Sequence, residues 1–146
     1  MKQSSKEILN ELLVDVFNHI LDIEQECLKK NGVSLSMTEV HVVEAISLVE
    51  PKTMTLIARK LRITLGTLTT SVDRLVKKGY VIRLYDESDR RKVLLKLTEL
   101  GEAVLLQHKK FHDEMLDSLF VDTNIEEDER LIKSLQNLKS YFKFKY

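Results

Sequence analysis

The chain has 146 residues, of which 43% are hydrophobic and 32% charged, a balance typical of a folded protein and unlike that of a disordered one. No run of residues approaches the roughly 18 apolar residues that a membrane-spanning helix needs. The polar N-terminus has no apolar core like that of a signal peptide, and the single cysteine, Cys27, excludes a disulfide within the chain. We therefore expect a cytoplasmic protein.

Charge is distributed unevenly along the sequence. Although 23 basic residues balance 23 acidic ones overall, the segment from Lys52 to Lys96 holds 12 basic and four acidic residues, a net charge of +8. The remainder is correspondingly acidic. A basic middle between acidic ends is expected if only the middle of the chain meets a polyanion such as nucleic acid.

The low content of helix breakers predicts a mainly helical chain, since there is one proline and there are four glycines. Ser4-x-x-Glu7 reads as the capping box of a long first helix, whose apolar stripe runs to about Asn31 before Gly32 stops it. A helix this long with so broad a stripe usually packs on more than one neighbour. A second subunit is a natural candidate.

The middle of the sequence predicts a helix–turn–helix. A second capping box, Ser36-x-x-Glu39, opens one helix, and Thr53 and Thr64 are N-cap candidates for two more. Only residues 62 and 63 separate these last two helices. Two short helices joined by so tight a turn form a helix–turn–helix.

After the helix that begins at Thr64, the spacing of the hydrophobic residues changes from that of a helix to the alternation typical of a strand. Residues 80–85 and 92–97 are rich in Val, Ile, Leu and Tyr and flank a charged turn, which predicts a β-hairpin wing. Thr98 is an N-cap for a fifth helix, and Asn124 is expected to open the last one. The predicted fold is therefore mainly α with a small β-hairpin wing.

We interpret residues 1–146 as a single domain with two tasks. Residues 36–98 form a winged helix–turn–helix DNA-binding lobe, and residues 5–31 and 99–146 form a helical dimerisation layer. The outer helices carry more apolar surface than one small domain needs, so a dimer interface is the simplest place for it.

The helix that begins at Thr64 has the composition expected of a major-groove reader. Its first half is rich in threonine, a middling helix former, and Gly66 allows DNA to approach the backbone closely. In the wing, Arg90 and Arg91 lie where a hairpin tip reaches a narrow minor groove, and Asp89 is expected to orient Arg91 through a salt bridge. Helix N-termini offer N–H groups to phosphates, although capping alone explains Ser36 and Thr53 equally well. The predicted DNA contacts are Ser36, Thr53, Thr64, Gly66, Thr67, Thr69, Thr70, Arg74, Lys77, Asp89, Arg90 and Arg91.

The segments 63–83, 89–91 and 97–101 resemble the MarR family of bacterial regulators. Within that family the chain is most similar to the FabT-like fatty-acid-synthesis repressors of Gram-positive cocci, on the basis of residues 64–71, Phe17-Asn-His19 with Ile23-Glu24, and 108–112. The resemblance implies a homodimer on a pseudo-palindromic operator, with residues 64–74 in the major groove and Arg91 in the minor groove. It also implies that a long acyl chain, presented by acyl carrier protein, acts as co-repressor.

Several other sites remain open as hypotheses. An apolar ligand tunnel is proposed with Phe17, Leu21, Leu105 and Met115 as walls, against the more ordinary interpretation that they are dimer core. His108 and His112, one helical turn apart, are able to chelate zinc together with His41 or Glu24, but paired histidines are more often surface residues, so no metal site and no cofactor is expected.

Two further functions are disfavoured. Cys27 lies on the apolar stripe of the first helix, where a buried thiol is normally inert, so a redox sensor is not expected. An enzyme is not expected either, because no nucleophile–base pair and no Gly-rich phosphate loop occurs.

Overall fold

The computed structural model describes residues 3–118, 121 and 128–145. The chain divides into two compact units, Met1–His108 and Lys109–Tyr146. The expected start of the last helix at Asn124 lies outside the described residues. In the second unit, α7 spans Glu129–Lys145, and Oδ1 of Asp128 accepts the N–H groups of Arg130 and Leu131 at its start.

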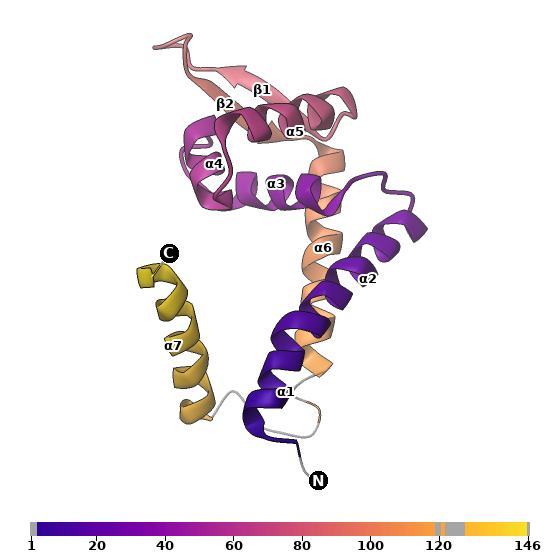
Figure 1. The fold of residues 1–146 in the computed structure, drawn as a ribbon. Helices are drawn as coiled ribbons and strands as arrows, with labels where there is room; N and C mark the ends of the chain where they lie inside the picture. Colours follow the sequence, from indigo (N-terminus) through magenta and orange to yellow (C-terminus); the bar gives the residue numbers. More distant parts are fainter. Residues whose placement is uncertain (1–2, 119–120, 122–127, 146) are drawn as a thin grey trace. The chain divides into compact units, whose positions relative to one another are not determined.

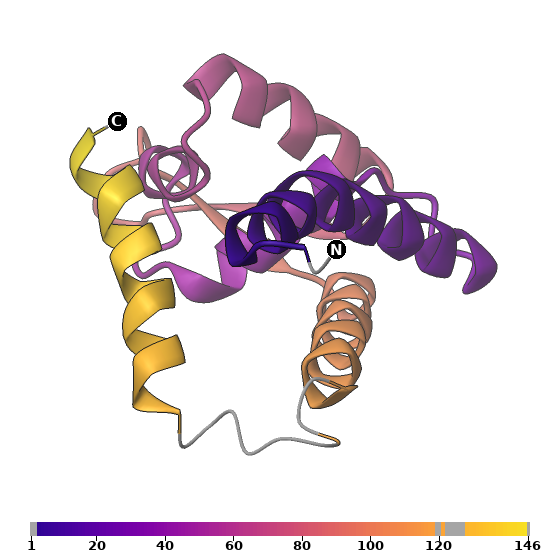
Figure 2. The same cartoon turned by 60° about the horizontal axis from the view of Figure 1, so that its bottom comes forward.

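The first helical segment begins as predicted at the Ser4–Glu7 capping box. It comprises α1 (Ser5–Glu11), the π-helical turn η1 (Leu12–Val16) and α2 (Phe17–Lys30), and its ribbon is continuous in Figures 1 and 2. Gly32 follows with a positive φ of 75°, a conformation that glycine adopts without steric cost. In α1 and η1 no residue is buried within the described structure.

The predicted helix–turn–helix is formed by α4 (Met54–Leu61) and α5 (Leu65–Lys77), and α3 (Met37–Leu48) precedes it. Each begins at the predicted cap, since the side chains of Ser36, Thr53 and Thr64 accept N–H groups of the first turn. Arg62 ends α4 in a left-handed conformation with φ 56°, which reverses the chain before α5. Side chains from all three helices and from both strands make up one core: Val40, Val43, Ile46, Ile57, Leu68, Val72, Leu75, Val81 and Leu95.

The wing is the predicted antiparallel hairpin of β1 (Val81–Tyr85) and β2 (Val93–Leu97), paired from Val81 opposite Leu97 to Tyr85 opposite Val93. Figure 1 shows the hairpin projecting beyond α5. An isolated bridge between Thr53 and Leu94 attaches the start of α4 to β2. Helix α5, the predicted major-groove reader, and the wing are therefore parts of one packed lobe.

Thr98 connects the wing to α6 (Glu99–Asp117). Its hydroxyl donates to the carbonyl of Gly79 at 2.6 Å, and its oxygen accepts the N–H of Gly101 at 3.3 Å. Gly101 is required here, because a Cβ at this position would collide with the carbonyl oxygen of Tyr80. Among the described residues, no helix has the length and apolarity needed to cross a membrane.

Candidate nucleic-acid interface

The start of α5 presents a polar surface to solvent. Thr64 caps the helix by accepting the N–H of Thr67 at 3.1 Å, and the two hydroxyl oxygens lie 2.8 Å apart. Both residues, together with Thr69 and Thr70, are exposed, whereas Ser71 is buried at 7% of its accessible surface. The predicted reader therefore consists of the threonines, and Ser71 belongs to the interior.

The hydroxyls of Thr69 and Thr70 are already engaged with the helix. They donate to the carbonyls of Leu65 at 2.8 Å and Gly66 at 3.2 Å. Their hydroxyl protons are thus used within the helix, although both residues are exposed. In this state they are suited to accept from amino groups of bases and to contact thymine methyls.

Gly66 leaves an open space on the surface of α5. A Cβ built at this position meets no atom within 4 Å, so packing within the protein does not require glycine there. Gly66 is the second residue of α5, so the cost of about 1 kcal/mol for a glycine in a helix interior is an upper bound here. A glycine that packing does not require is consistent with the predicted close approach of DNA.

Leu65 is placed differently from the sequence expectation. Helical spacing places Leu65 on the same face as Leu68 and Val72, which predicts an inward side chain, but 52% of its surface is exposed. It lines a groove of about 380 Å³ between the start of α4, the start of α5 and β2. The other lining residues are Thr53, Met54, Thr55, Arg91, Lys92 and Val93.

This groove brings together residues that are distant in the sequence. Thr53 caps α4, Leu65 begins α5 and Arg91 follows the wing tip. Leu65 and Lys92 were not among the predicted contacts. The run of basic residues at 90–92 was a usable signal for Lys92, whereas the apolar pattern provided no signal for the exposure of Leu65.

The wing tip is organised by two aspartates. Asp86 accepts the hydroxyl of Ser88 at 2.7 Å and its N–H at 2.9 Å, and these hydrogen bonds lower the pKa of the Asp86 carboxyl. Asp89 accepts the backbone N–H of Arg91 at 3.0 Å. The expected salt bridge from Asp89 to the Arg91 side chain does not form in residues 86–92, all of which are described. Asp89 instead shapes the turn and leaves the guanidinium exposed to solvent.

Further along α5, Arg74 and Lys77 are exposed, and Asp73 forms an ion pair with Arg83 on β1. Positions 67, 70, 74 and 77 follow helical spacing and share one face. The threonines predicted to read bases and the cations predicted to bind phosphates are therefore arranged along a single face of the helix.

At the start of α3, Ser36 and Glu39 cap each other reciprocally. The Ser36 hydroxyl oxygen accepts the N–H of Glu39 at 3.2 Å, and Glu39 Oε2 accepts the N–H of Ser36 at 2.8 Å. Lys78, the C-cap of α5, donates to both carboxylate oxygens of Glu39 at 3.0 Å. The backbone N–H and the hydroxyl oxygen of Ser36 thus both have partners within the capping box, which favours the capping interpretation of this residue.

Comparison with known proteins agrees with this geometry. The sequence model of the MarR family matches residues 35–93. The HTH-type transcriptional regulator SarZ of Staphylococcus haemolyticus is 33% identical over 115 residues, which cover 77% of this chain and 74% of that protein. The chain belongs to the MarR family. It is a DNA-binding transcription regulator with a winged helix fold.

Two other MarR-family relatives extend the comparison. The crystal structure of Streptococcus pneumoniae FabT in complex with DNA matches with a TM-score of 0.85 and 34% identity, covering 95% of this chain and 98% of that one. The multiple antibiotic resistance protein MarR of Escherichia coli is 42% identical over 67 residues, which are 42% of this chain and 46% of that protein. These relatives are regulators, in agreement with the prediction that the chain is not an enzyme.

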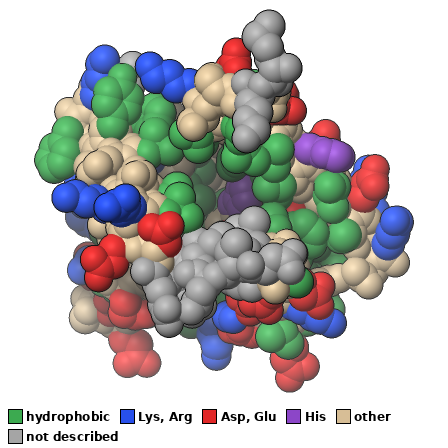
Figure 3. Space-filling view, turned by 90° about the horizontal axis from the view of Figure 1, so that it is seen from below, with side chains coloured by type: hydrophobic (Ala, Val, Ile, Leu, Met, Phe, Trp, Pro, Cys, Tyr) green, Lys and Arg blue, Asp and Glu red, His purple; other side chains and the backbone are tan. Residues whose placement is uncertain are grey.

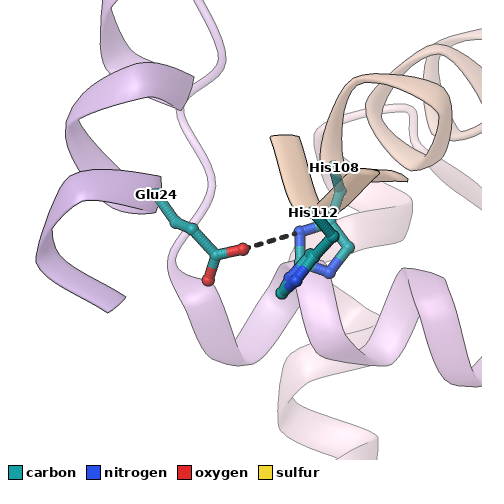
Figure 4. Close-up of side chains that lie close together, drawn as sticks. All are labelled: Glu24, His108 and His112. Atoms are coloured by element: carbon teal, nitrogen blue, oxygen red, sulfur yellow. Dashed lines mark ion pairs between the residues drawn. The ribbon is translucent and has the colours of Figure 1, made fainter. Parts of the chain in front are cut away.

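Away from the reading surface, a histidine–carboxylate cluster joins three helices. Figure 4 shows Glu24 on α2 directed toward His108 on α6. His108 Nδ1 lies 3.4 Å from Glu24 Oε1, and its Nε2 lies 3.5 Å from Glu44 Oε2 on α3. The ring of His41 meets that of His108 edge-on, with centroids 6.0 Å apart. Glu24 and His108 are both buried, which is unusual for groups that carry or accept charge.

The predicted ligand-tunnel residues are found in varied surroundings. Phe17 is 59% exposed, Leu21 is half-buried, and Leu105 is partly buried against the hydrophobic core described above. Met115 belongs to the second unit. The tunnel stays a prediction. Cys27 is half-buried on α2, as its position on the apolar stripe indicates.

Proposed function

We propose that this chain is a homodimeric, sequence-specific repressor that binds a pseudo-palindromic operator. The observation that carries the proposal is the exposed threonine face of α5 beside a groove that Arg91 enters from the wing. An exposed helix face of small polar side chains fits the major groove, and an arginine on a hairpin fits the minor groove.

The roles of individual residues follow from their chemistry. Thr67, Thr69 and Thr70 read bases through hydroxyl lone pairs and methyl groups, and Thr64 and Gly66 permit close approach. Arg74 and Lys77 bind phosphates, as do the backbone N–H groups near Ser36 and Thr53. The wing residues Arg90 and Arg91 read groove shape, and Asp89 holds the turn that presents them.

The exposed apolar surface of α1, η1 and α2 supports a homodimer. Large apolar side chains here are between 39% and 59% exposed, more than a lone domain normally leaves in one place. Figure 3 shows hydrophobic side chains exposed on the face of the molecule seen from below. The large hydrophobic residues of the first helical segment that are exposed in this way are Ile8, Leu9, Leu12, Leu13, Val14, Val16, Phe17 and Ile23. A second copy of the chain is proposed to cover them, and a dimer that reads one face of DNA has to hold its two reader helices about one DNA turn, roughly 34 Å, apart.

The regulated process is proposed to be fatty-acid synthesis, with a long acyl chain on acyl carrier protein as co-repressor. The sequence resemblance to FabT-like repressors and the structural similarity to FabT support this assignment. Phe17, Leu21, Leu105 and Met115 are the candidate walls for the acyl chain. A ligand acts in this way only if it binds the DNA-competent arrangement more tightly than the alternatives.

One titration tests both parts of the proposal. A duplex enriched by the wild-type protein from a randomised library is titrated alone, and then with acyl-loaded or unloaded carrier protein. We expect two-fold symmetry in the enriched sequences and tighter binding only with the acyl-loaded form. Enriched sequences without symmetry contradict the dimeric reader, and equal effects of the two carrier forms contradict the acyl co-repressor.

A second candidate effector is zinc, favoured by the buried contact between Glu24 and His108 with His41 beside it. Imidazole and carboxylate are the usual nitrogen and oxygen ligands of zinc. His112 follows His108 by one turn of α6 and shares its face through helical spacing.

Competition with a chromophoric chelator measures zinc binding directly. The zinc hypothesis predicts one tight site per chain that is lost in His108→Asn and retained in His19→Asn, a histidine elsewhere on α2. Removal of zinc is then expected to change operator affinity. Absence of a tight site, or a site unaffected by His108→Asn, excludes this candidate.

A further inference from the structure

A second groove with basic lining residues lies at the C-terminal end of α5, opposite to the end where Leu65 and Arg91 line the first groove. It measures about 660 Å³ and is bordered by the last turn of α2, the α2–α3 connection, the first turn of α3 and the end of α5. Figure 1 shows the ends of α2 and α5 on the same side of this unit, next to the start of α3. Its lining residues are Gln25, Lys29, Val33, Ser34, Leu35, Ser36, Glu39, Arg74 and Lys78.

The charges in this groove do not cancel. Lys78 donates to both oxygens of Glu39 and to the carbonyl of Ser34 at 2.9 Å, so its three N–H donors and the one acidic side chain of the lining are satisfied together. Lys29 and Arg74 are exposed and have no ion pair with any residue that the structure describes. Two cations therefore remain available to an external anion.

The groove is also held rigidly. Gln25 on α2 donates to the carbonyl of Leu35 at 2.7 Å and accepts the N–H of Met37 at 3.1 Å. Lys78 holds the same connection from the α5 side through Ser34. A site fixed from two sides loses little entropy when a ligand binds.

We propose that this groove binds a backbone phosphate of the operator, so that α2 contacts DNA directly through Lys29. Arg74 lies on the same face of α5 as Thr67 and Thr70, so it points toward the strand that borders the bases they read. An arginine fork, a lysine ammonium and the hydroxyl of Ser34 are a suitable donor set for a phosphodiester. The inference rests on the proposed DNA-reading role of α5.

The consequence is a second contact surface outside the helix–turn–helix. Because α2 carries Glu24 as well as Lys29 and continues directly from the exposed apolar surface of α1 and η1, a shift of α2 changes the distance between Lys29 and Arg74. An effector that acts on α2 then has a direct path to operator affinity.

The test compares Lys29→Ala with Lys30→Ala, an exposed lysine next in sequence that does not line the groove. Binding to the enriched duplex and to an unrelated duplex is measured by fluorescence anisotropy across a salt series. Lys29→Ala is expected to weaken binding to both duplexes by about three- to ten-fold at moderate salt. It is also expected to reduce the slope of log affinity against log salt concentration by about one. Lys30→Ala is expected to leave the affinity and the slope unchanged, apart from general screening.

Single neutral methylphosphonates along the duplex locate the contact. One position is expected to weaken wild-type binding but to have no further effect on Lys29→Ala. Equal behaviour of Lys29→Ala and Lys30→Ala overturns the proposal, while failure of wild-type protein to enrich any duplex overturns the reading function itself.

Two other ligands are distinguished in the same experiment. If inorganic phosphate binds in a Lys29-dependent manner while DNA affinity is unchanged by Lys29→Ala, the groove serves a small anion and the proposal is wrong. If Lys29→Ala changes only the response to acyl carrier protein, an acidic protein is the ligand and the proposal is equally wrong.

Discussion

Asp73 on α5 and Arg83 on β1 form an ion pair that joins the reader helix to the wing. Asp73 is 60% exposed and Arg83 28% exposed, so the pair contributes little to folding, at most about 1 kcal/mol. We infer that its effect is geometric, because it connects α5, the predicted reader helix, to strand β1 of the wing. The two elements predicted to contact DNA are thereby joined before DNA binds.

The charge-neutral double variant Asp73→Asn/Arg83→Gln tests this role. It preserves the net charge but removes the ion pair between α5 and β1. We therefore expect weaker operator binding, while the free energy of unfolding changes by less than about 1 kcal/mol. Anisotropy titration and urea denaturation measure the two quantities. The equally charge-neutral pair Glu87→Gln/Lys96→Gln, on the exposed wing, serves as control and is expected to bind like wild type. Equal affinities of both double variants contradict a geometric role.

Gly66 allows a prediction in which stability and function change in opposite directions. Gly66→Ala introduces a methyl group into open space and improves helix propensity, so the free protein is expected to gain up to about 1 kcal/mol. Operator affinity is expected to fall because the methyl group occupies space that DNA needs. Thermal denaturation and anisotropy measure these effects. Unchanged or tighter DNA binding shows that DNA does not approach this turn.

The sequence predicted most elements because the caps and stop signals are local. Ser36, Thr53 and Thr64 each accept a hydrogen bond from the helix they open, and this preference is encoded within three residues. The wing strands were also predicted within one residue of their bounds, since alternation and turn residues lie close together in the sequence.

What the sequence did not predict depends on contacts between distant segments. Leu65 is 52% exposed although helical spacing places it on the apolar face of α5, and Glu39 is buried against Lys78, which lies 39 residues away. Asp89 was expected to pair with a side chain but binds a backbone N–H instead. The local pattern identifies which residues are polar, whereas tertiary packing decides which partner each one meets.

Substitutions on the reader face are expected to separate base contacts from phosphate contacts. Thr67→Val and Thr70→Val remove hydroxyls but keep shape, so the preferred base is expected to change at one position of the operator, by about 1–3 kcal/mol of discrimination. Lys77→Ala is expected to weaken binding to all DNA sequences alike and to lower the salt dependence of the affinity. Enrichment from a randomised library measures preference for each variant. A uniform loss for the threonine variants shows that they contact phosphate only.

The wing gives a prediction for Arg91, whose guanidinium has no ion pair with its neighbours at residues 86–92. Arg91→Ala is expected to reduce operator affinity about ten-fold while leaving the fold intact, because a narrow minor groove attracts an inserted cation. Arg91→Lys keeps the charge but is more strongly hydrated, so it is expected to restore only part of the affinity. Replacing A·T pairs at the flanks of the operator by G·C pairs is expected to weaken binding by the wild-type protein more than binding by the Arg91→Ala variant. Affinity of Arg91→Ala equal to that of wild type at moderate salt removes the wing from the interface.

The buried contact between Glu24 and His108 predicts a stability effect that is independent of DNA. Glu24→Ala removes a carboxylate that is 3% exposed and leaves His108 without that partner, so unfolding free energy is expected to fall by about 2 kcal/mol. Glu26→Ala, on an exposed position of the same helix, is the matched control and is expected to have little effect. Urea denaturation with a chelator present measures both variants without a contribution from metal. Equal stabilities show that the Glu24–His108 contact does not hold α2 to α6, and any function of the cluster then has to be sought in ligand binding alone.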